Sequence, residues 1–325
     1  MTDPANPTDP VREGGGDGTT ESAHGSIDEG GEASGGGPTR EDGRESPGGL
    51  RSGDGKGFTN APRLEDSGES DSGMGRASSG EFDGRTVVVT GGVRGVGRGI
   101  SEAFRAAGAR VLACARRPPE APLDGVEYVR LDVRDPDAVN AFFATTGPVR
   151  AVVNNAGGTP YLPLSEGDPH RHAKIIELNL IAPLIVARAA RPVLEPGGSV
   201  LMIGSVSARR PSPGTAAYGA AKAGLASLAA SLAVEWAPRV RVNCVTLGMV
   251  RTERAALHYG DDAGLAAVAR TVPLGRLAAP DDAGAACVFL ASDAAAYISG
   301  ADLLVHGGGE RPAYLGASTA GDTRP

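Results

Sequence analysis

The sequence predicts an α/β protein, and two observations carry this prediction. From Arg85 onward, short runs rich in β-branched residues alternate with Ala-rich stretches of helical character, which is the pattern of an α/β fold. The first of these runs, Thr86–Thr90, leads directly into a glycine-rich turn that opens a helix. A parallel sheet with crossover helices is therefore expected from residue 85 onward.

Residues 1–84 have a different composition. They contain 21 Gly and 18 acidic residues against 7 basic ones, a net charge of −11 that leaves +4 for the remainder. No periodic apolar run there is long enough to build a core, so we expect a disordered, solvated acidic tail. A partner-binding arm is one interpretation of this tail. We favour a solubilising extension or a start-site artefact, with Met74 as the alternative start.

Targeting signals and metal motifs are not apparent. The N-terminus is acidic and lacks the apolar core of a signal peptide, and we expect no run of the ~20 apolar residues that span a bilayer. Cys114, Cys244 and Cys287 stand singly, without metal-ligand spacing. We therefore expect a cytoplasmic protein that binds no metal, no membrane and no nucleic acid, and whose cysteines are small core residues.

The glycine turn after the first strand reads Gly91-Gly-Val-Arg-Gly-Val-Gly-Arg-Gly-Ile100, and its helix is expected to run to about Ala107. Glycines permit a tight turn and a close approach of the backbone, so a pyrophosphate can rest against the helix N-terminus. A purely structural turn is the alternative, because such a motif alone is weak evidence. The further strands are expected at 110–114, 125–131, 151–153, up to Ser205, at 240–246 and at 302–306.

Tyr218 and Lys222 lie four residues apart at the start of an Ala-rich helix that is expected to end near Trp236, so both side chains share one face. A neighbouring ammonium favours the phenolate and brings a phenol, which ordinarily titrates near pH ~10, closer to working pH as a general acid or base. From Arg85 onward only Lys174 and Lys222 are lysines among 25 basic residues. A compact ammonium at 222 therefore looks required, against the alternative of a chance pair on a solvated face.

The motifs together resemble one family. They are Thr90-Gly91-x-x-x-Gly95-x-Gly97, Asn154-Asn155-Ala156-Gly157, and Ser205 thirteen residues before Tyr218-x-x-x-Lys222. From about Arg85 to Gly309 the chain resembles the short-chain dehydrogenase/reductase family, in particular its bacterial 3-oxoacyl-thioester reductases. The resemblance implies a doubly wound Rossmann fold, a seven-stranded parallel sheet with helices on both faces, in a single domain (85–311) followed by a C-terminal tail (312–325).

The resemblance also implies site residues. Tyr218 would exchange a proton with the substrate oxygen, Ser205 would hydrogen-bond that oxygen, and Lys222 would bind the nicotinamide ribose and lower the pKa of Tyr218. Asn179 would be the fourth catalytic residue, and Asp132 would sit at the adenine. The implied cofactor-binding residues are Gly91, Arg94, Gly95, Val96, Gly97, Ala115, Arg116, Asp132, Val133, Asn155, Ala156, Gly157, Tyr218, Lys222, Gly248, Val250 and Thr252.

Asn179 has a second argument from the residues themselves. Pro183 has no N–H, so within a helix (172–194) the carbonyl of Asn179 would lose its partner and the helix would kink there. A freed carbonyl near Lys222 would hold a water that relays protons. The alternative is a polar residue satisfied within its helix.

Two residues depart from the family pattern, Leu247 in place of a proline and His306 in place of an aspartate. Residues 254–274 should cover the substrate. The last helix of the domain should span 280–292.

The residues at the end of the second strand indicate which nicotinamide cofactor the protein prefers. Members of this fold that prefer NAD place an acidic side chain there, whereas this chain has Ala115, followed by Arg116, with Arg94 in the glycine turn. Guanidinium groups bind phosphate well, so we expect NADP(H) to be preferred, with NAD(H) possible. The alternative is that these arginines are solvated surface charges.

The sequence therefore predicts an oxidoreductase that interconverts a ketone and a secondary alcohol by hydride transfer. A β-ketoacyl group and an alicyclic or steroid-like ketone are the open substrate candidates. A catalytically silent dinucleotide sensor on the same fold is the alternative function. The apolar circumference of the helices that carry Asn179 and Tyr218 predicts a homotetramer.

Overall fold

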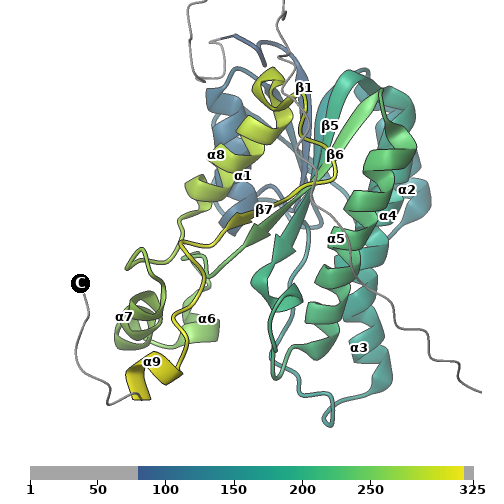
Figure 1. Cartoon of the computed structure of the whole chain (residues 1–325). Coiled ribbons are helices and arrows are strands. Elements are labelled where there is room, and N and C mark those ends of the chain that lie inside the picture. Colours follow the sequence, from purple (N-terminus) through teal and green to yellow (C-terminus); the bar gives the residue numbers. More distant parts are fainter. Residues whose placement is uncertain (1–79, 318–325) are drawn as a thin grey trace, which may run out of the picture. The chain divides into compact units, whose positions relative to one another are not determined.

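The computed structural model describes residues 80–317 of the chain, and the predicted tail up to residue 79 lies outside the described part. Its sheet has seven strands, all parallel, in the order β3-β2-β1-β4-β5-β6-β7 (Figure 1). The predicted fold class is confirmed. The strands are β1 (Thr86–Thr90), β2 (Arg110–Ala115), β3 (Val126–Arg130), β4 (Val149–Asn154), β5 (Leu194–Ser205), β6 (Val240–Leu247) and β7 (Asp302–Val305).

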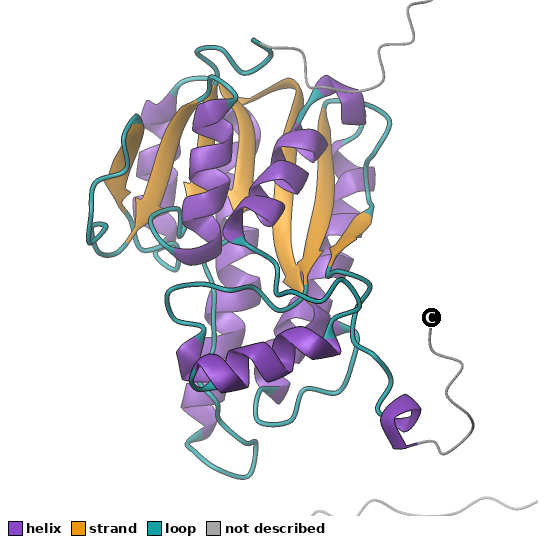
Figure 2. Ribbon diagram, turned by 90° about the vertical axis from the view of Figure 1, so that its left-hand side faces the viewer, coloured by secondary structure: helices purple, strands orange, loops and turns teal. Residues whose placement is uncertain are grey.

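Helices cover both faces of the sheet (Figure 2). One face carries α1 (Gly95–Ala106) and α8 (Pro280–Ala291); the other carries α2 (Pro136–Thr146), α4 (Ala182–Ala190) and α5 (Ala216–Trp236). The central strands β1, β4 and β6 are buried along their whole length, because helices on both sides require continuous apolar runs. The remaining helices are α3 (Pro169–Ile176), α6 (Ala256–Tyr259), α7 (Asp262–Thr271), α9 (Tyr314–Ala317), the π-helical η1 (Glu177–Ile181) and the 3₁₀ turns η2 (Arg191–Val193), η3 (Val206–Ala208) and η4 (Asp293–Ala295).

The predicted bounds of the helix over 172–194 are wrong. It begins with α3 at Pro169, passes through the π-helical η1 and ends with α4 at Ala190, while Leu194 already starts β5. At the junction the N–H of Ala182 donates to the carbonyl of Glu177, five residues back. The expected break near Pro183 is thus a π-turn, a form in which a helix absorbs a missing donor. The expected end of the last helix at residue 292 is one residue late.

The expectation that no apolar run could span a bilayer also needs correction. Within the described residues one helix, α5, is long and apolar enough to cross a membrane by length and composition alone. It is this apolar because it is built largely from Ala and Leu. In the fold α5 packs on β5 and β6 and carries the buried ammonium of Lys222, so it serves as a helix of the domain core.

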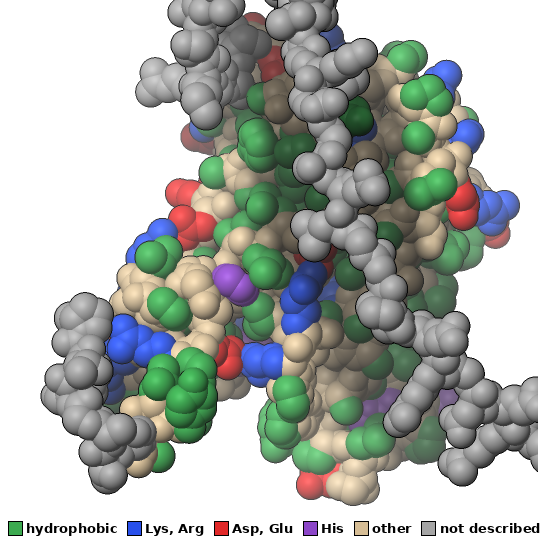
Figure 3. Space-filling view, viewed as in Figure 1, with side chains coloured by type: hydrophobic (Ala, Val, Ile, Leu, Met, Phe, Trp, Pro, Cys, Tyr) green, Lys and Arg blue, Asp and Glu red, His purple; other side chains and the backbone are tan. Residues whose placement is uncertain are grey.

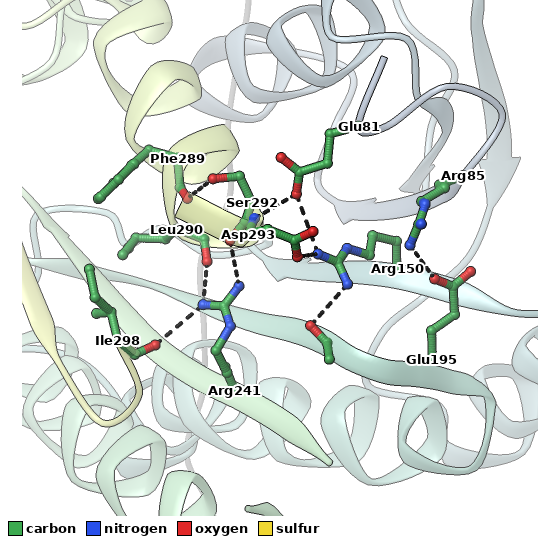
Figure 4. Close-up of polar contacts among 11 residues, drawn as sticks. Glu81, Arg85, Arg150, Glu195, Arg241, Phe289, Leu290, Ser292, Asp293 and Ile298 are labelled. Atoms are coloured by element: carbon green, nitrogen blue, oxygen red, sulfur yellow. Dashed lines mark hydrogen bonds and ion pairs between the residues drawn. The ribbon is translucent and has the colours of Figure 1, made fainter. Parts of the chain in front are cut away.

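The folded body starts before residue 85, the boundary expected from composition. Phe82 is 1% exposed and packs its ring edge-on to Phe104 at 5.4 Å between centroids. The Glu81 carboxylate accepts hydrogen bonds from the Asp293 backbone N–H (2.6 Å) and from the buried Arg150 guanidinium (3.4 Å). Arg150 also binds the Asp293 carboxylate at 2.6 Å (Figure 4). Glu81 and Phe82 therefore tie the entry of the chain to β4 and to the end of α8.

A second buried arginine, near the start of β6, also binds the C-terminal end of α8. Arg241 of β6 donates to the carbonyl of Leu290 (2.7 Å) and to that of Ser292 (3.0 Å) at the C-terminus of α8 (Figure 4). These carbonyls have no partner inside the helix, and a planar guanidinium can bind two of them at once. Arginine at this position is thus explained by helix capping, away from the carboxyl edge of the sheet.

A chain that starts at Met74 should keep its melting temperature, whereas one that starts at Arg85 should not. The second start deletes Phe82, whose burial is worth about 3 to 5 kcal/mol, together with Glu81, the partner of Arg150. We expect a fall of at least roughly 6 °C for the Arg85 start, measured by circular dichroism. Equal melting temperatures for the two shortened chains would contradict this account of the edge.

Candidate active site

The carboxyl ends of the parallel strands bring the predicted site residues to one edge of the sheet. The glycine turn follows β1, Asn155 follows β4, Ser205 ends β5, and α5 carries Tyr218 and Lys222 over the same edge. Open parallel sheets bind ligands at this edge, where the strand order reverses between β1 and β4. The structure thus places the predicted catalytic and cofactor residues where the fold favours a site.

The glycine turn is shaped by two close approaches. Gly91 has φ +64°, a left-handed conformation that glycine adopts without cost, and its N–H donates to the Cys114 carbonyl at 2.7 Å. A side chain at Gly97 would collide with the Gly91 carbonyl oxygen and with the Asn155 amide. Glycine at both positions lets α1 start directly against β1.

The N-terminus of α1 suits a bound phosphate. Its N-cap residue, Arg94, makes no side-chain capping bond, and the first turn holds no acidic residue. The first backbone N–H groups of a helix have no partner within the helix and favour an anion. The residues present here therefore fit the pyrophosphate of a dinucleotide, and the exposed Arg94 side chain adds a cation.

Thr90 and Asn155 fasten the glycine turn to β4. The Asn155 side-chain amide donates to the carbonyls of Thr90 (2.9 Å) and Gly91 (3.2 Å), and the Thr90 hydroxyl accepts the N–H groups of Asn155 and Ala156, each at 3.0 Å. The sequence places Thr90 at the end of the first strand and predicts no role for its side chain. Its contact with the turn after β4 is visible only in the paired sheet.

Lys222 lies beneath the Tyr218 ring. Its ammonium is 5.6 Å from the ring centroid and donates to the Ile203 carbonyl at 2.7 Å, and the residue is only 3% exposed. The Ser205 hydroxyl, at the end of β5, accepts the Ser207 N–H at 3.2 Å. The structure therefore brings Ser205, Tyr218 and Lys222 together, as expected for groups that act on one substrate oxygen.

Burial dominates the titration of both groups. It raises the pKa of Tyr218, opposed by a hydrogen bond with Ser205 and reinforced by Tyr259. Burial lowers the pKa of Lys222 from 10.5 to about 8. In the protein alone burial of the phenol therefore outweighs the hydrogen bond with Ser205, and the lowering of the Tyr218 pKa by Lys222 stays a prediction.

The stability of the cofactor-free protein should rise with pH because of Lys222. Its folded pKa lies below its unfolded one, so the unfolded chain binds more protons between about pH 8 and 10.5 and the penalty for burying the charge disappears across that window. We expect wild type to gain up to about 3 kcal/mol relative to Lys222→Met between these pH values, measured by urea unfolding. Lys174→Met, at an exposed position, is the control and should show no such gain. A difference independent of pH would contradict the buried ammonium.

The Asn179 side chain is fully used within the protein. Its amide donates to the carbonyls of Gly158 and Ile175, both at 2.9 Å, and its oxygen accepts the Gly158 N–H at 3.0 Å. A Cβ at Gly157 would lie 2.6 Å from the same oxygen and 3.4 Å from the Lys222 ammonium. Asn179 thus holds the loop after β4 close to Lys222, and its predicted part in proton relay stays a prediction.

The adenosine end of the predicted site contains one unexpected ion pair. The Asp132 carboxylate binds Arg134 through both oxygens, at 3.0 and 2.7 Å, and this pairing together with Arg116 lowers the pKa of Asp132. The sequence patterns predict no role for Arg134. Ala115 ends β2 beside β3, and Arg116 is exposed, so the end of the second strand carries a cation and no acidic side chain. Val133 is buried in the core between the sheet and α2.

The loop after β6 closes over the glycine turn. A Cβ at Gly95 would lie 3.5 Å from the Thr252 methyl group, and Val250 pairs with Ala278 in an isolated bridge and packs, like Val96, against the core on the α1 side. Gly248 lies against His306, which a Cβ at Gly248 would meet at 2.8 Å. Among residues 80–317 no group of three or more His, Cys, Asp or Glu side chains is arranged to hold a metal ion.

Comparisons with known proteins decide the family. The family model described as "Enoyl-(Acyl carrier protein) reductase" matches residues 91–310. The chain is 36% identical over 241 residues to the 3-oxoacyl-[acyl-carrier-protein] reductase FabG of Escherichia coli, an alignment that covers 70% of this chain and 98% of that protein. The chain belongs to the short-chain dehydrogenase/reductase family.

Other members of the family bear different names. L-fucose dehydrogenase of Oryctolagus cuniculus is 36% identical over 254 residues, covering 72% of this chain and 88% of that protein. The ligand-free aldohexose dehydrogenase of Thermoplasma acidophilum superposes with a TM-score of 0.68 at 27% identity, covering 76% of this chain and all (100%) of that one. Membership makes the chain an NAD(P)-dependent oxidoreductase that acts on CH–OH donors.

Proposed function

We propose that this protein is an NADP(H)-dependent reductase that interconverts a ketone and a secondary alcohol, with Tyr218 as general acid and base. The observation that carries the proposal is the buried Lys222 ammonium beneath the Tyr218 ring, 5.6 Å from the ring centroid. Ser205 lowers the pKa of the same phenol. Bound NADP(H) would supply or accept the hydride. The residues of this chain would then exchange one proton with the substrate oxygen and bind that oxygen.

Each side chain has a role that follows from its chemistry. The Tyr218 hydroxyl donates its proton to the carbonyl oxygen as negative charge develops there, and takes it back in oxidation. Ser205 donates a hydrogen bond to the same oxygen. A charged Lys222 stabilises the phenolate left behind, and the N–H groups at the start of α1 hold the pyrophosphate.

The substrate class is open among three candidates. The sequence favoured a β-ketoacyl group or an alicyclic ketone, and the names of the rabbit and Thermoplasma relatives add sugar hydroxyl groups. A β-ketoacyl thioester and an alicyclic ketone assayed with NADPH, and a free sugar assayed with NADP, all by nicotinamide fluorescence, test the proposal. Turnover of one of them supports it. Tight NADPH binding without turnover of any of them would favour the silent dinucleotide sensor.

We also propose a cytoplasmic homotetramer, supported by apolar side chains that the single chain leaves exposed. Ile176, Ile181 and Leu184 on α3, η1 and α4 are 37%, 42% and 41% exposed, and Val234 on α5 is 80% exposed. The most apolar window of α5 is only 33% buried. Apolar helix faces of this kind are normally covered by another subunit.

Light scattering at micromolar concentration should therefore give four times the chain mass. Leu184→Glu places a charge in the proposed interface and should lower the mass, because burying an unpaired carboxylate is costly. Leu164→Glu is the matched control, since Leu164 is 69% exposed on a loop outside these helices. A monomeric wild type would refute the tetramer.

A further inference from the structure

A cavity of about 460 Å³ lies next to the proposed active site. It opens between the loop that follows Ser205 and the chain that follows β7. Val206, the neighbour of Ser205, lines it, and so do Gly248 and Met249 after β6. Its volume is within the range of small-molecule sites, and its lining begins one residue after Ser205.

The charged lining of this cavity is predominantly basic. It contains Arg209, Arg210 and Arg311 against one carboxylate, Glu310. Figure 3 shows basic side chains on this face between α5 and the helices α6 and α7. We call these two helices the lid, because residues 254–274 are expected to cover the substrate. The Arg and Glu lining thus carries a formal charge of +2, and the Asp302 carboxylate, which pairs with Arg209 from outside the lining, reduces the charge of the cluster to +1. The cluster stays cationic even with both of its ion pairs formed.

The three arginines keep hydrogen-bond donors free for a ligand. Arg209 binds Asp302 through one nitrogen at 2.5 Å, and Arg210 binds Glu310 through one nitrogen at 2.7 Å. Arg311 has no ion-pair partner within the described residues. A guanidinium has five N–H donors, so one ion pair leaves most of them unused.

The backbone around Arg311 is fixed in place. The Arg311 N–H donates to the Thr271 carbonyl at the end of α7 (2.9 Å), and the Leu274 N–H donates to the Gly307 carbonyl (3.1 Å). The segment after β7 is therefore tied to the lid, which holds the third arginine of the cavity against the loop of the first two. Such preorganisation lowers the cost of binding.

The cluster also surrounds a phenol of the lid. Burial raises the pKa of Tyr259, Arg210 lowers it and Glu310 raises it. Tyr259 in turn raises the pKa of Tyr218, so one residue of the lid lies between the charges of the cavity and the proposed acid.

We infer that this cavity binds an anionic group, a carboxylate or a phosphate, carried by the substrate. Arginine forks bind both groups through paired hydrogen bonds. The inference rests on the proposed function, since it names the class of ketone that this site would take. The reacting carbonyl would lie at Ser205 and Tyr218, and the anionic end would lie against Arg209 and Arg311.

Two matched substrate pairs test the inference and separate the two anions. Acetoacetate is compared with its methyl ester, and dihydroxyacetone phosphate with dihydroxyacetone. We expect kcat/KM with NADPH to favour the anionic member of at least one pair by roughly tenfold, which corresponds to ~1.4 kcal/mol, and the preference to fall with added salt. Equal kcat/KM values within both pairs would overturn the inference.

Two variants should change this preference in opposite directions. Arg311→Gln removes a cation and should reduce the preference severalfold, whereas Glu310→Gln removes the carboxylate and should increase it. Misfolding cannot produce both results. Arg105→Gln, an equal charge change at an exposed position on α1, is the control and should leave the preference unchanged. If both Arg311→Gln and Arg209→Gln keep the full kcat/KM preference for the anionic substrate, the anion binds outside this cavity and the inference is wrong.

A binding measurement separates this inference from the proposed function. With the Tyr218→Phe protein saturated with NADP, acetoacetate or dihydroxyacetone phosphate should raise the melting temperature more than its neutral counterpart, and Arg311→Gln should abolish the difference. If the anionic ligands stabilise the variant more and wild type turns over no ketone, the anion site is supported and the proposed reductase activity is refuted. If wild type reduces neutral ketones and the anionic ligands have no added effect, the reductase activity is supported and the anion site is refuted.

Discussion

Tyr218→Phe is expected to lower ketone reduction by at least about a hundredfold while NADPH binding stays nearly unchanged. The variant keeps the ring above Lys222 and loses only the hydroxyl that would protonate the substrate oxygen, and a positioned general acid is worth about 10²- to 10⁴-fold. Steady-state kinetics give the loss in turnover, and the fluorescence of bound NADPH gives the affinity.

Two further variants locate the effect. Lys222→Ala should damage both turnover and cofactor binding, because the ammonium lies beneath the phenol and, in the proposed function, would also bind the nicotinamide ribose. Tyr259→Phe, which removes the neighbouring phenol on the lid, should retain most of the activity. Substantial ketone reduction by Tyr218→Phe would show that another group is the general acid.

Wild type is expected to prefer NADPH over NADH by at least roughly tenfold in kcat/KM, which requires ~1.4 kcal/mol of differential binding. Ala115 leaves the end of β2 without the carboxylate that repels a 2′-phosphate, while Arg116 and Arg94 are exposed cations near the same pocket. Ala115→Asp combined with Arg116→Ala should reverse the preference, because it adds the repulsion and removes an attraction.

Arg117→Ala is the matched control for this pair, since Arg117 is the next exposed arginine along the chain. It should change the NADPH preference much less than the double substitution does. Equal or better kinetics with NADH in wild type would refute this account of the adenosine pocket and leave the assignment of Tyr218 untouched.

The structure corrects the predicted start of the domain and adds a partner for Asp132, neither of which could be predicted from residues close together in the sequence. Composition placed the domain start at residue 85, yet Phe82 and Glu81 belong to the core because they meet Phe104 and Arg150. Asp132 was expected to lie at the adenine, and only the folded chain reveals that Arg134 also binds its carboxylate.

The sequence by itself determined the fold class and the residues at the carboxyl edge. The β1 run, the glycine turn and the Tyr218–Lys222 spacing are local patterns, and a parallel sheet carries each strand end to the same edge. The tertiary structure alone decided the burial of Lys222, the outcome for the Tyr218 pKa, and the meeting of Arg209 with Arg311 around one cavity. These properties depend on contacts between residues far apart in the chain and on the loss of water around them, and neither quantity is encoded in residue spacing.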